Sequence, residues 1–175
     1  MNKKLFIVYS FIAFLLISCW RENQNIQYTI SNKQLNDTLV KANQTFIDTE
    51  KDRIEAYINR RNLVMEESGT GLRYMIIKHS EGIQATDGKN ALVNFKVSLL
   101  DGTECYSSEK KGPQEFLIGQ DNVESGLHEG IKLMRVGEKA KFILPSHLAH
   151  GLIGDENKIP PRSVIVYDLE LIRLR

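Results

Sequence analysis

A single helical pattern stands inside a long run of strand patterns in the C-terminal part of the chain. Residues 123–134 carry Leu127, Ile131 and Met134 at three- and four-residue spacing, which predicts a short amphipathic helix. The Asp-Gly pair at 101–102 is a strong hairpin-turn signal. Strand patterns cover 72–78, 91–100, 105–108, 114–118, 139–144 and 164–174. One short helix among antiparallel strands predicts an α+β fold in which the sheet wraps around the helix.

The length and composition fit one folded domain with an appendage. The chain has 175 residues, of which 42% are hydrophobic, and this supports a sizeable core. Its 23 Lys and Arg side chains nearly balance 22 Asp and Glu side chains, so bulk charge gives no sign of a nucleic-acid partner. Two Cys residues are too few for a disulfide framework. We therefore expect an ordinary globular domain that binds no nucleic acid.

The first residues are typical of a secretory signal. Two lysines at 3–4 precede an almost purely apolar run, 5–17, which is too short to span a membrane comfortably. The Leu-Ile-Ser-Cys sequence at 16–19 resembles the lipobox of bacterial lipoproteins, in which the signal is cut before the Cys and the Cys is lipidated. We expect a lipoprotein signal peptide at 1–18 and a membrane anchor on Cys19. An ordinary signal peptide or a short N-terminal anchor is the alternative.

A tether and a helical segment are expected between the signal and the folded domain, which is predicted at 69–175. The lipidated Cys and the tether are expected at 19–31, because residues 21–31 are polar, as flexible tethers are. Residues 32–64 carry apolar side chains at helical spacing, Leu35 and Leu39 among them. We favour a surface helix that packs partly on the domain. The alternative is a spacer or a partner-binding helix.

A series of short motifs runs through the predicted domain in a fixed order. They are Val93-Asn94-Phe95, Asp101-Gly102, Ser107-Ser108, Phe116–Gly119, Gly126–Gly130, Met134–Glu138, Gly151, Ile159-Pro160-Pro161 and Val166–Leu171. In this order and spacing, residues from about Gly71 to Arg175 resemble the FKBP-type peptidyl-prolyl cis-trans isomerases. With the lipobox and the helical segment, the chain is similar to a gliding-motility-associated lipoprotein subfamily of Bacteroidetes. The resemblance implies an FKBP-like antiparallel sheet around one short helix, isomerase activity and no cofactor.

Isomerisation of an X-Pro bond needs no nucleophile, metal or proton shuttle. The amide rotates against a resonance barrier of roughly 18–20 kcal/mol, while the cis and trans forms of X-Pro differ little in energy. A catalyst therefore needs an apolar cleft that holds the proline ring and favours the twisted amide over both planar forms. A few hydrogen-bond donors should hold the flanking carbonyl groups.

The resemblance implies which positions line that cleft. Phe95 and Phe116 belong to the walls, Leu127 to the floor, and the backbone N–H of Glu124 binds a ligand carbonyl. His150 stands where the family has a Tyr donor, and a neutral imidazole can still donate one N–H. The expected catalytic residues are Phe95, Val123, Glu124, Leu127, His150, Ile159 and Tyr167, and the expected substrate-binding residues are Tyr106 and Phe116. Without the resemblance, the apolar members of this set would be core residues of any packed half-barrel.

Several positions depart from the family pattern. Cys105 and Tyr106 stand where many members have Phe and Asp, Gln114 replaces an aromatic residue, and Leu127 is smaller than the usual Trp. Together these changes predict weak isomerase activity or altered substrate choice. They also leave open a second function, in which the cleft binds proline-bearing segments as a chaperone or envelope-complex subunit with negligible catalysis. In a third view the helical segment is the working part.

The expected protein is a lipid-anchored isomerase that assists the folding of exported or envelope proteins. Its expected substrates are proline-containing polypeptides, and its expected partners include gliding or envelope machinery. The lipid on Cys19 would hold it in the cell envelope, at the periplasmic side of the outer membrane. No metal is expected, because His147 and His150 lack an evident third ligand. Cys105 is expected to be a buried small hydrophobe, with a free thiol as the alternative.

Overall fold

The computed structural model describes residues 32–175. The predictions for the signal peptide, the tether and Cys19 lie outside the described residues. The chain divides into two compact units, and the division at Lys41 falls within helix α2 (Asn32–Arg60). The part of α2 from Ala42 to Arg60 belongs to the second unit, Ala42–Arg175. Within residues 32–175, the structure contains no helix with the length and apolar character needed to cross a membrane.

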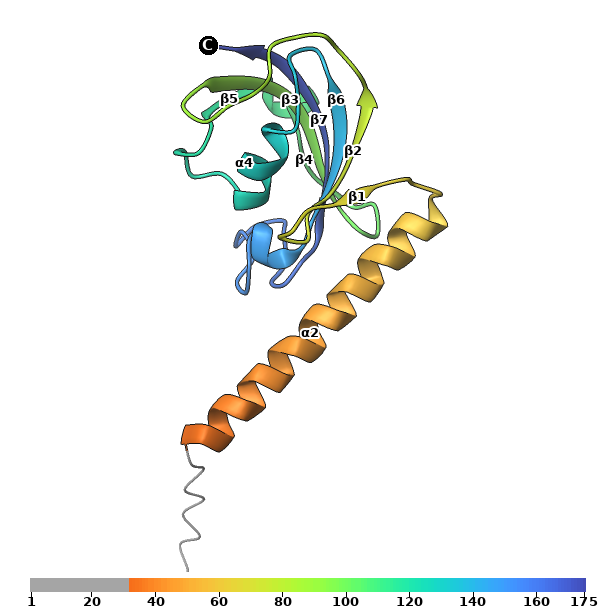
Figure 1. Ribbon diagram of the computed structural model, residues 1–175, viewed down its shortest axis with the longest axis vertical. Helices are drawn as coiled ribbons and strands as arrows, with labels where there is room; N and C mark the ends of the chain where they lie inside the picture. The colour runs from red at the N-terminus through yellow and green to blue at the C-terminus, as the bar shows by residue number, and fades with distance from the viewer. Residues whose placement is uncertain (1–31) are drawn as a thin grey trace, which may run out of the picture. The chain divides into compact units, whose positions relative to one another are not determined.

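The second unit is built on one antiparallel sheet with a short helix against it (Figure 1). The strands are β1 (Glu66–Glu67), β2 (Arg73–Lys78), β3 (Asn90–Leu99), β4 (Glu104–Ser107), β5 (Gln114–Leu117), β6 (Lys139–Leu144) and β7 (Ile165–Leu174). The helices after α2 are α3 (Ser108–Lys111), α4 (Ser125–Ile131) and the 3₁₀ helix η1 (Ser146–Leu148). The strand order is β1-β2-β6-β7-β3-β4, and β5 pairs with β3. The predicted α+β fold class, including the helix that precedes the domain, is confirmed.

Several element boundaries differ from the sequence prediction. Helix α4 ends at Ile131 rather than at 134, because the chain turns there: the N–H of Leu133 bonds to the carbonyl of Gly130 over 3.1 Å. Ser108, predicted to end a strand, instead begins the short helix α3, whose Lys110 pairs with Glu104 over 2.6 Å. Helix α2 stops at Arg60 rather than 64.

The end of α2 has a clear local cause. Asn62 adopts a φ of 51°, the left-handed conformation that commonly closes a helix. The N–H of Leu63 then bonds back to the carbonyl of Ile58 over 3.1 Å, which satisfies one of the last helical acceptors. Residues 66–67, between the predicted helical segment and the predicted domain, pair with β2 as the short strand β1.

Helix α4 lies very close to strand β6. A Cβ atom placed on Gly126 would come within 2.6 Å of the Leu144 side chain, and one on Gly130 within 2.9 Å of the Phe142 ring. Both glycines therefore lie on the helix face that meets the sheet. Leu127 and the rest of the α4 apolar face join the main core on this side. Because β6 pairs with β7, this close approach also fixes the position of the start of α4 relative to β7.

Helix α2 packs against the opposite face of the sheet. Successive residues of a strand point to opposite faces, and Ile143 and Val166 belong to a second apolar cluster that contains Ile54 and Tyr57 of α2. An ion pair reinforces this contact: buried Arg73 binds Glu55 of α2 over 2.7 Å and Glu67 over 2.6 Å. The favoured interpretation of the segment, a surface helix packed partly on the domain, agrees with this arrangement.

Candidate active site

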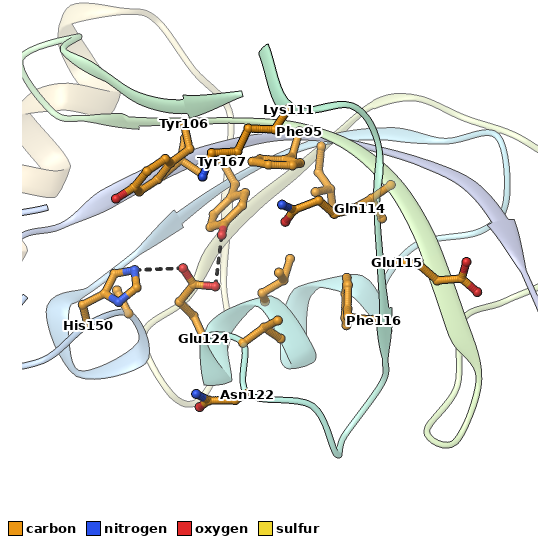
Figure 2. A pocket seen from close by; sticks show the side chains of 16 residues that line it. Phe95, Tyr106, Lys111, Gln114, Glu115, Phe116, Asn122, Glu124, His150 and Tyr167 are labelled. Atoms are coloured by element: carbon orange, nitrogen blue, oxygen red, sulfur yellow. Dashed lines mark hydrogen bonds and ion pairs between the residues drawn. The ribbon is translucent and has the colours of Figure 1, made fainter. Parts of the chain in front are cut away.

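A cavity of about 590 Å³ lies where the sheet, α4 and the loop after η1 meet (Figure 2). The lining residues are Val93, Phe95, Val97, Tyr106, Lys111, Gln114, Glu115, Phe116, Asn122, Val123, Glu124, Leu127, Ala149, His150, Tyr167 and Leu169. All the predicted catalytic and substrate-binding residues are among them except Ile159. The fold thus brings together residues that stand far apart in the sequence.

The walls come from strands β3 and β7 and from the start of α4. Phe95 and Tyr167 project from neighbouring antiparallel strands, in which Val97 pairs with Tyr167. Leu127 is buried on α4, and Val123 lies just before that helix. These side chains supply the apolar part of the cleft, as the resemblance implied.

Ile159 does not reach the cavity wall. Its side chain is buried in the main core. Its backbone N–H donates to Oδ1 of Asp155 over 2.7 Å, and its carbonyl accepts from the N–H of Asp155 over 3.1 Å. In this structure Ile159 therefore shapes the loop that carries His150 and does not line the cleft.

A carboxylate, that of Glu124, lies on the wall of the cleft just before α4. The hydroxyl of Tyr167 donates to Oε2 of Glu124 over 3.0 Å, and Nε2 of His150 lies 2.9 Å from Oε1 of the same side chain (Figure 2). Only 12% of the Glu124 side chain is exposed. Burial of Tyr167, together with the negative charge of Glu124, raises the pKa of the Tyr167 hydroxyl well above its ordinary value. The phenol therefore stays a neutral donor to the carboxylate.

The backbone N–H of Glu124 is available to a ligand. It makes no hydrogen bond to any residue of the described part of the chain, while the Glu124 carbonyl accepts from Leu127 and His128. The resemblance implied a role for this N–H but none for the side chain. The sequence carried a signal for the side chain, because the family usually has Ile where this chain has Glu124.

Tyr106 forms the other polar edge of the cleft. Its hydroxyl donates to Asp155, and the Nζ of Lys111 lies 4.4 Å from the centroid of its ring. Burial alone would raise the pKa of Asp155, but hydrogen bonds from Tyr106 and from the N–H groups of Ile159 and Asn157 outweigh it and lower the pKa to about 2. Neither Asp155 nor Lys111 was identified from the sequence.

The loop before α4 is held by a histidine. The ring of His128 meets Phe116 edge-on, with 5.8 Å between their centroids. Its Nδ1 accepts the N–H of Gly119 over 2.9 Å, so its Nε2, 2.9 Å from the carbonyl of Asp121, is the donor to that group. This arrangement keeps Phe116 and Val123 at the cavity edge.

The remaining candidates have structural partners. Nε2 of His147 lies 3.0 Å from the carbonyl of Thr70. Within residues 32–175 no group of three or more His, Cys, Asp or Glu side chains is placed to hold a metal ion. Cys105 is buried, and its thiol faces the carbonyls of Thr103 and Lys158. Desolvation raises the pKa of this thiol, as expected for a buried small hydrophobe.

The fold and the cleft define a class of protein: an α+β domain whose sheet curves around one short helix, with an aromatic-walled cleft above that helix. The family model described as FKBP-type peptidyl-prolyl cis-trans isomerase matches residues 81–172, more than half of the chain. The chain belongs to this family.

Curated relatives and solved structures agree with the assignment. The FKBP-type isomerase FkpA of Escherichia coli (strain K12) is 36% identical over 112 residues, which are 63% of this chain and 40% of that protein. A probable FkpA of Neisseria meningitidis is 34% identical over 127 residues, 71% of this chain and 46% of that protein. The chain thus spans less than half the length of these relatives.

Two crystal structures share the fold. That of FkpA from Escherichia coli has a TM-score of 0.65 and 27% identity, covering 100% of this chain and 83% of that one. That of AtFKBP13 has a TM-score of 0.61 and 28% identity, covering 64% of this chain and 99% of that one.

Proposed function

We propose that this protein is a peptidyl-prolyl cis-trans isomerase that assists the folding of exported or envelope proteins. One observation carries the proposal: Phe95, Leu127 and Tyr167 surround a cavity of about 590 Å³ into which a proline ring fits, beside the backbone N–H of Glu124, which has no hydrogen-bond partner among residues 32–175. The family membership of the domain supports the same activity.

The geometry supports catalysis by binding alone. The proline ring would rest on Leu127 and against Phe95, while the N–H of Glu124 holds a carbonyl of the peptide. Removing water favours the twisted amide, because the twisted amide is less polar than either planar form. A cleft that fits the twisted form better than the planar forms lowers the barrier without making or breaking a bond.

The experiment measures rate and binding on the same peptides. Isomerisation of a peptide series with different residues before Pro is followed in a protease-coupled assay, and binding of the peptides is followed by calorimetry. Acceleration that Tyr167→Ala reduces supports the isomerase. Absence of acceleration for every peptide would overturn it.

A binding module without catalysis is the second candidate, and Glu124 is the observation that favours it. Its carboxylate occupies both Tyr167 and His150, which otherwise could donate to a substrate. In the experiment above, proline-dependent binding without acceleration would assign this function.

Anchoring through Cys19 and a role in the envelope are further parts of the proposal. The lipobox-like sequence at 16–19 supports a lipid anchor at the periplasmic side of the outer membrane. The resemblance to GldI, the gliding-motility lipoprotein, suggests that gliding or envelope machinery supplies the partners. Cys19→Ser should release the protein from the membrane fraction, with Cys105→Ser as the control. Retention of the Cys19→Ser variant in that fraction would reject the anchor.

A further inference from the structure

Residues 145–162, most of the loop between β6 and β7, carry His150 and are cross-linked by backbone hydrogen bonds. The carbonyl of Ser146 accepts the N–H of Gly151 over 2.8 Å. The carbonyl of Gly151 in turn accepts the N–H of Arg162 over 2.9 Å. Two hydrogen bonds thus connect both ends of the loop through Gly151, the residue that follows His150. A displacement of either end would move His150.

Helix α2 binds the first end of this loop through a buried charge. Glu50 is only 5% exposed, and its Oε1 accepts the backbone N–H of Ser146 over 2.8 Å. Its Oε2 lies 3.2 Å from the hydroxyl of Ser146, which donates to it. A carboxylate is costly to bury, and charge-assisted bonds such as these offset that cost. Glu50 therefore fixes the position of Ser146 directly.

The same helix contacts the second end of the loop. The guanidinium of Arg162 lies over the ring of Phe46, with 4.8 Å between Cζ and the ring centroid. This is cation–π geometry. Arg162 has a φ of 55°, a left-handed conformation that is uncommon for a residue with a side chain. Such a conformation persists where surrounding contacts determine it, and here those contacts are Phe46 and the carbonyl of Gly151.

Phe46 and Glu50 are four residues apart on α2 and so lie on one face of the helix. Glu50 binds Ser146, and Phe46 contacts Arg162. Since Ser146 and Arg162 are both hydrogen-bonded to Gly151, these contacts connect both ends of the loop to one face of α2. We propose that Phe46 and Glu50 of α2 are positioning residues, which clamp both ends of the loop 145–162 and thereby hold His150 against Glu124 in the cleft.

The clamp is separable from the general attachment of α2. Ile54 and Tyr57 pack on the outer face of the sheet, and Glu55 binds Arg73 over 2.7 Å. None of these three contacts the loop through an ion pair or hydrogen bond within residues 32–175. Glu55→Gln is therefore a matched control. It removes a negative charge from α2 five residues after Glu50 and leaves the Glu50–Ser146 hydrogen bonds in place.

The inference about activity rests on the proposed isomerase function, whereas the inference about the loop does not. The test compares the full-length chain with Glu50→Ala, Glu50→Gln, Phe46→Leu and Glu55→Gln. Amide hydrogen exchange of residues 146–151 and 162 reports the clamp, and KM and kcat for a proline peptide report the cleft. Glu50→Gln keeps an acceptor oxygen, and Phe46→Leu keeps an apolar side chain while removing the ring, so both remain informative if Glu50→Ala does not fold.

We expect Glu50→Ala to speed exchange of the loop amides about tenfold or more through local opening. Glu50→Gln should restore part of the protection, and Phe46→Leu should speed exchange mainly near Arg162. KM should rise about three- to tenfold with a smaller change in kcat, because a misplaced loop weakens peptide binding. Glu55→Gln should leave both readouts at wild-type values.

Equal loop exchange in Glu50→Ala and Glu55→Gln would overturn the clamp, as would faster exchange spread evenly over the whole domain. A wild-type chain without isomerase activity would reject the proposed function, and the exchange data would still decide on the clamp. Faster loop exchange with unchanged KM and kcat would show that the loop is held by α2 but that His150 placement does not depend on it, which overturns the positioning role.

Discussion

The hydroxyl of Tyr167 donates a hydrogen bond to Oε2 of Glu124 over 3.0 Å inside the cleft. At the position of Glu124 the family usually has an apolar residue. His150 engages the other oxygen over 2.9 Å. A carboxylate with little solvent contact is tolerated because both oxygens have donors. A proline ring entering this cleft would therefore meet a charged group on one wall. This is the feature that most separates the cleft from the apolar one that the resemblance implies.

Replacing that carboxylate should improve catalysis. Glu124→Ile keeps the backbone N–H and removes a charge that must be desolvated when the proline ring binds, so kcat/KM should rise about three- to tenfold, equivalent to roughly 1 kcal/mol. Stability should fall by about 1–2 kcal/mol, because the buried Tyr167 hydroxyl loses its acceptor. Initial rates and urea unfolding measure the two effects. Glu124→Gln, which keeps an acceptor for Tyr167, is the control; a lower kcat/KM in Glu124→Ile would contradict the argument.

Truncation of Tyr167 should reduce activity more than replacement of His150. Tyr167 is 5% exposed and forms a wall of the cleft, whereas 27% of the His150 side chain is exposed at the loop edge. We expect Tyr167→Ala to lower kcat/KM tenfold or more, roughly 1.4 kcal/mol of transition-state binding, and His150→Phe about threefold. Circular dichroism checks that both variants fold. Equal losses would mean that the cleft is not laid out as described.

Local patterns in the sequence were sufficient to predict most of the strands and the short helix α4. The strand pattern at 164–174 was confirmed, since the observed β7 begins at Ile165 and ends at Leu174. The cleft positions could be assigned from motif spacing for the same reason: antiparallel pairing of β3 with β7 brings Phe95 near Tyr167 whenever the strands form.

The missed features depend on contacts between distant residues. Glu50 and Ser146 are 96 residues apart, and no local periodicity indicates that a helix carboxylate will bind a loop N–H. Asp155 was missed because its partners, Tyr106 and the loop N–H groups, converge only after the loop folds. Ile159 was assigned to the cleft by motif position, but its side chain turns into the core. Side-chain direction in a loop is set by packing, which spacing alone does not determine.

The contact between α4 and β6 should tolerate no added methyl group. In Gly126→Ala the new Cβ would lie 2.6 Å from Leu144 and 3.0 Å from the carbonyl of Leu148, so the helix must shift. We expect a loss of about 1–3 kcal/mol in unfolding free energy, the usual cost of overpacking. Gly69→Ala is the control, because a Cβ there meets nothing within 4 Å. Urea unfolding of both variants decides the matter, and equal stabilities would contradict the close packing.

Stability should depend on the ionisation of Asp155 in acid. Its pKa of about 2 lies below the ordinary value of 3.8, so the folded state favours the carboxylate. The resulting stability is complete above roughly pH 5 and is lost as pH falls through 3.8 toward 2. The shift corresponds to at most about 2.5 kcal/mol, and solvent screening on this partly exposed loop reduces the expected value to about 1 kcal/mol.

Asp155→Asn tests this linkage, with Glu156→Gln on the same loop as the control for loss of a charge. Urea unfolding of the wild type and both variants is compared at pH 7 and at successively lower pH. The wild type should exceed Asp155→Asn by about 1 kcal/mol at pH 7, and the difference should shrink as pH falls through 3.8 toward 2, the pKa in the folded protein. Glu156→Gln should show no such convergence, because the exposed side chain of Glu156 makes no hydrogen bond or ion pair within residues 32–175. A constant difference between wild type and Asp155→Asn across this pH range would show that the carboxylate charge does not hold the loop.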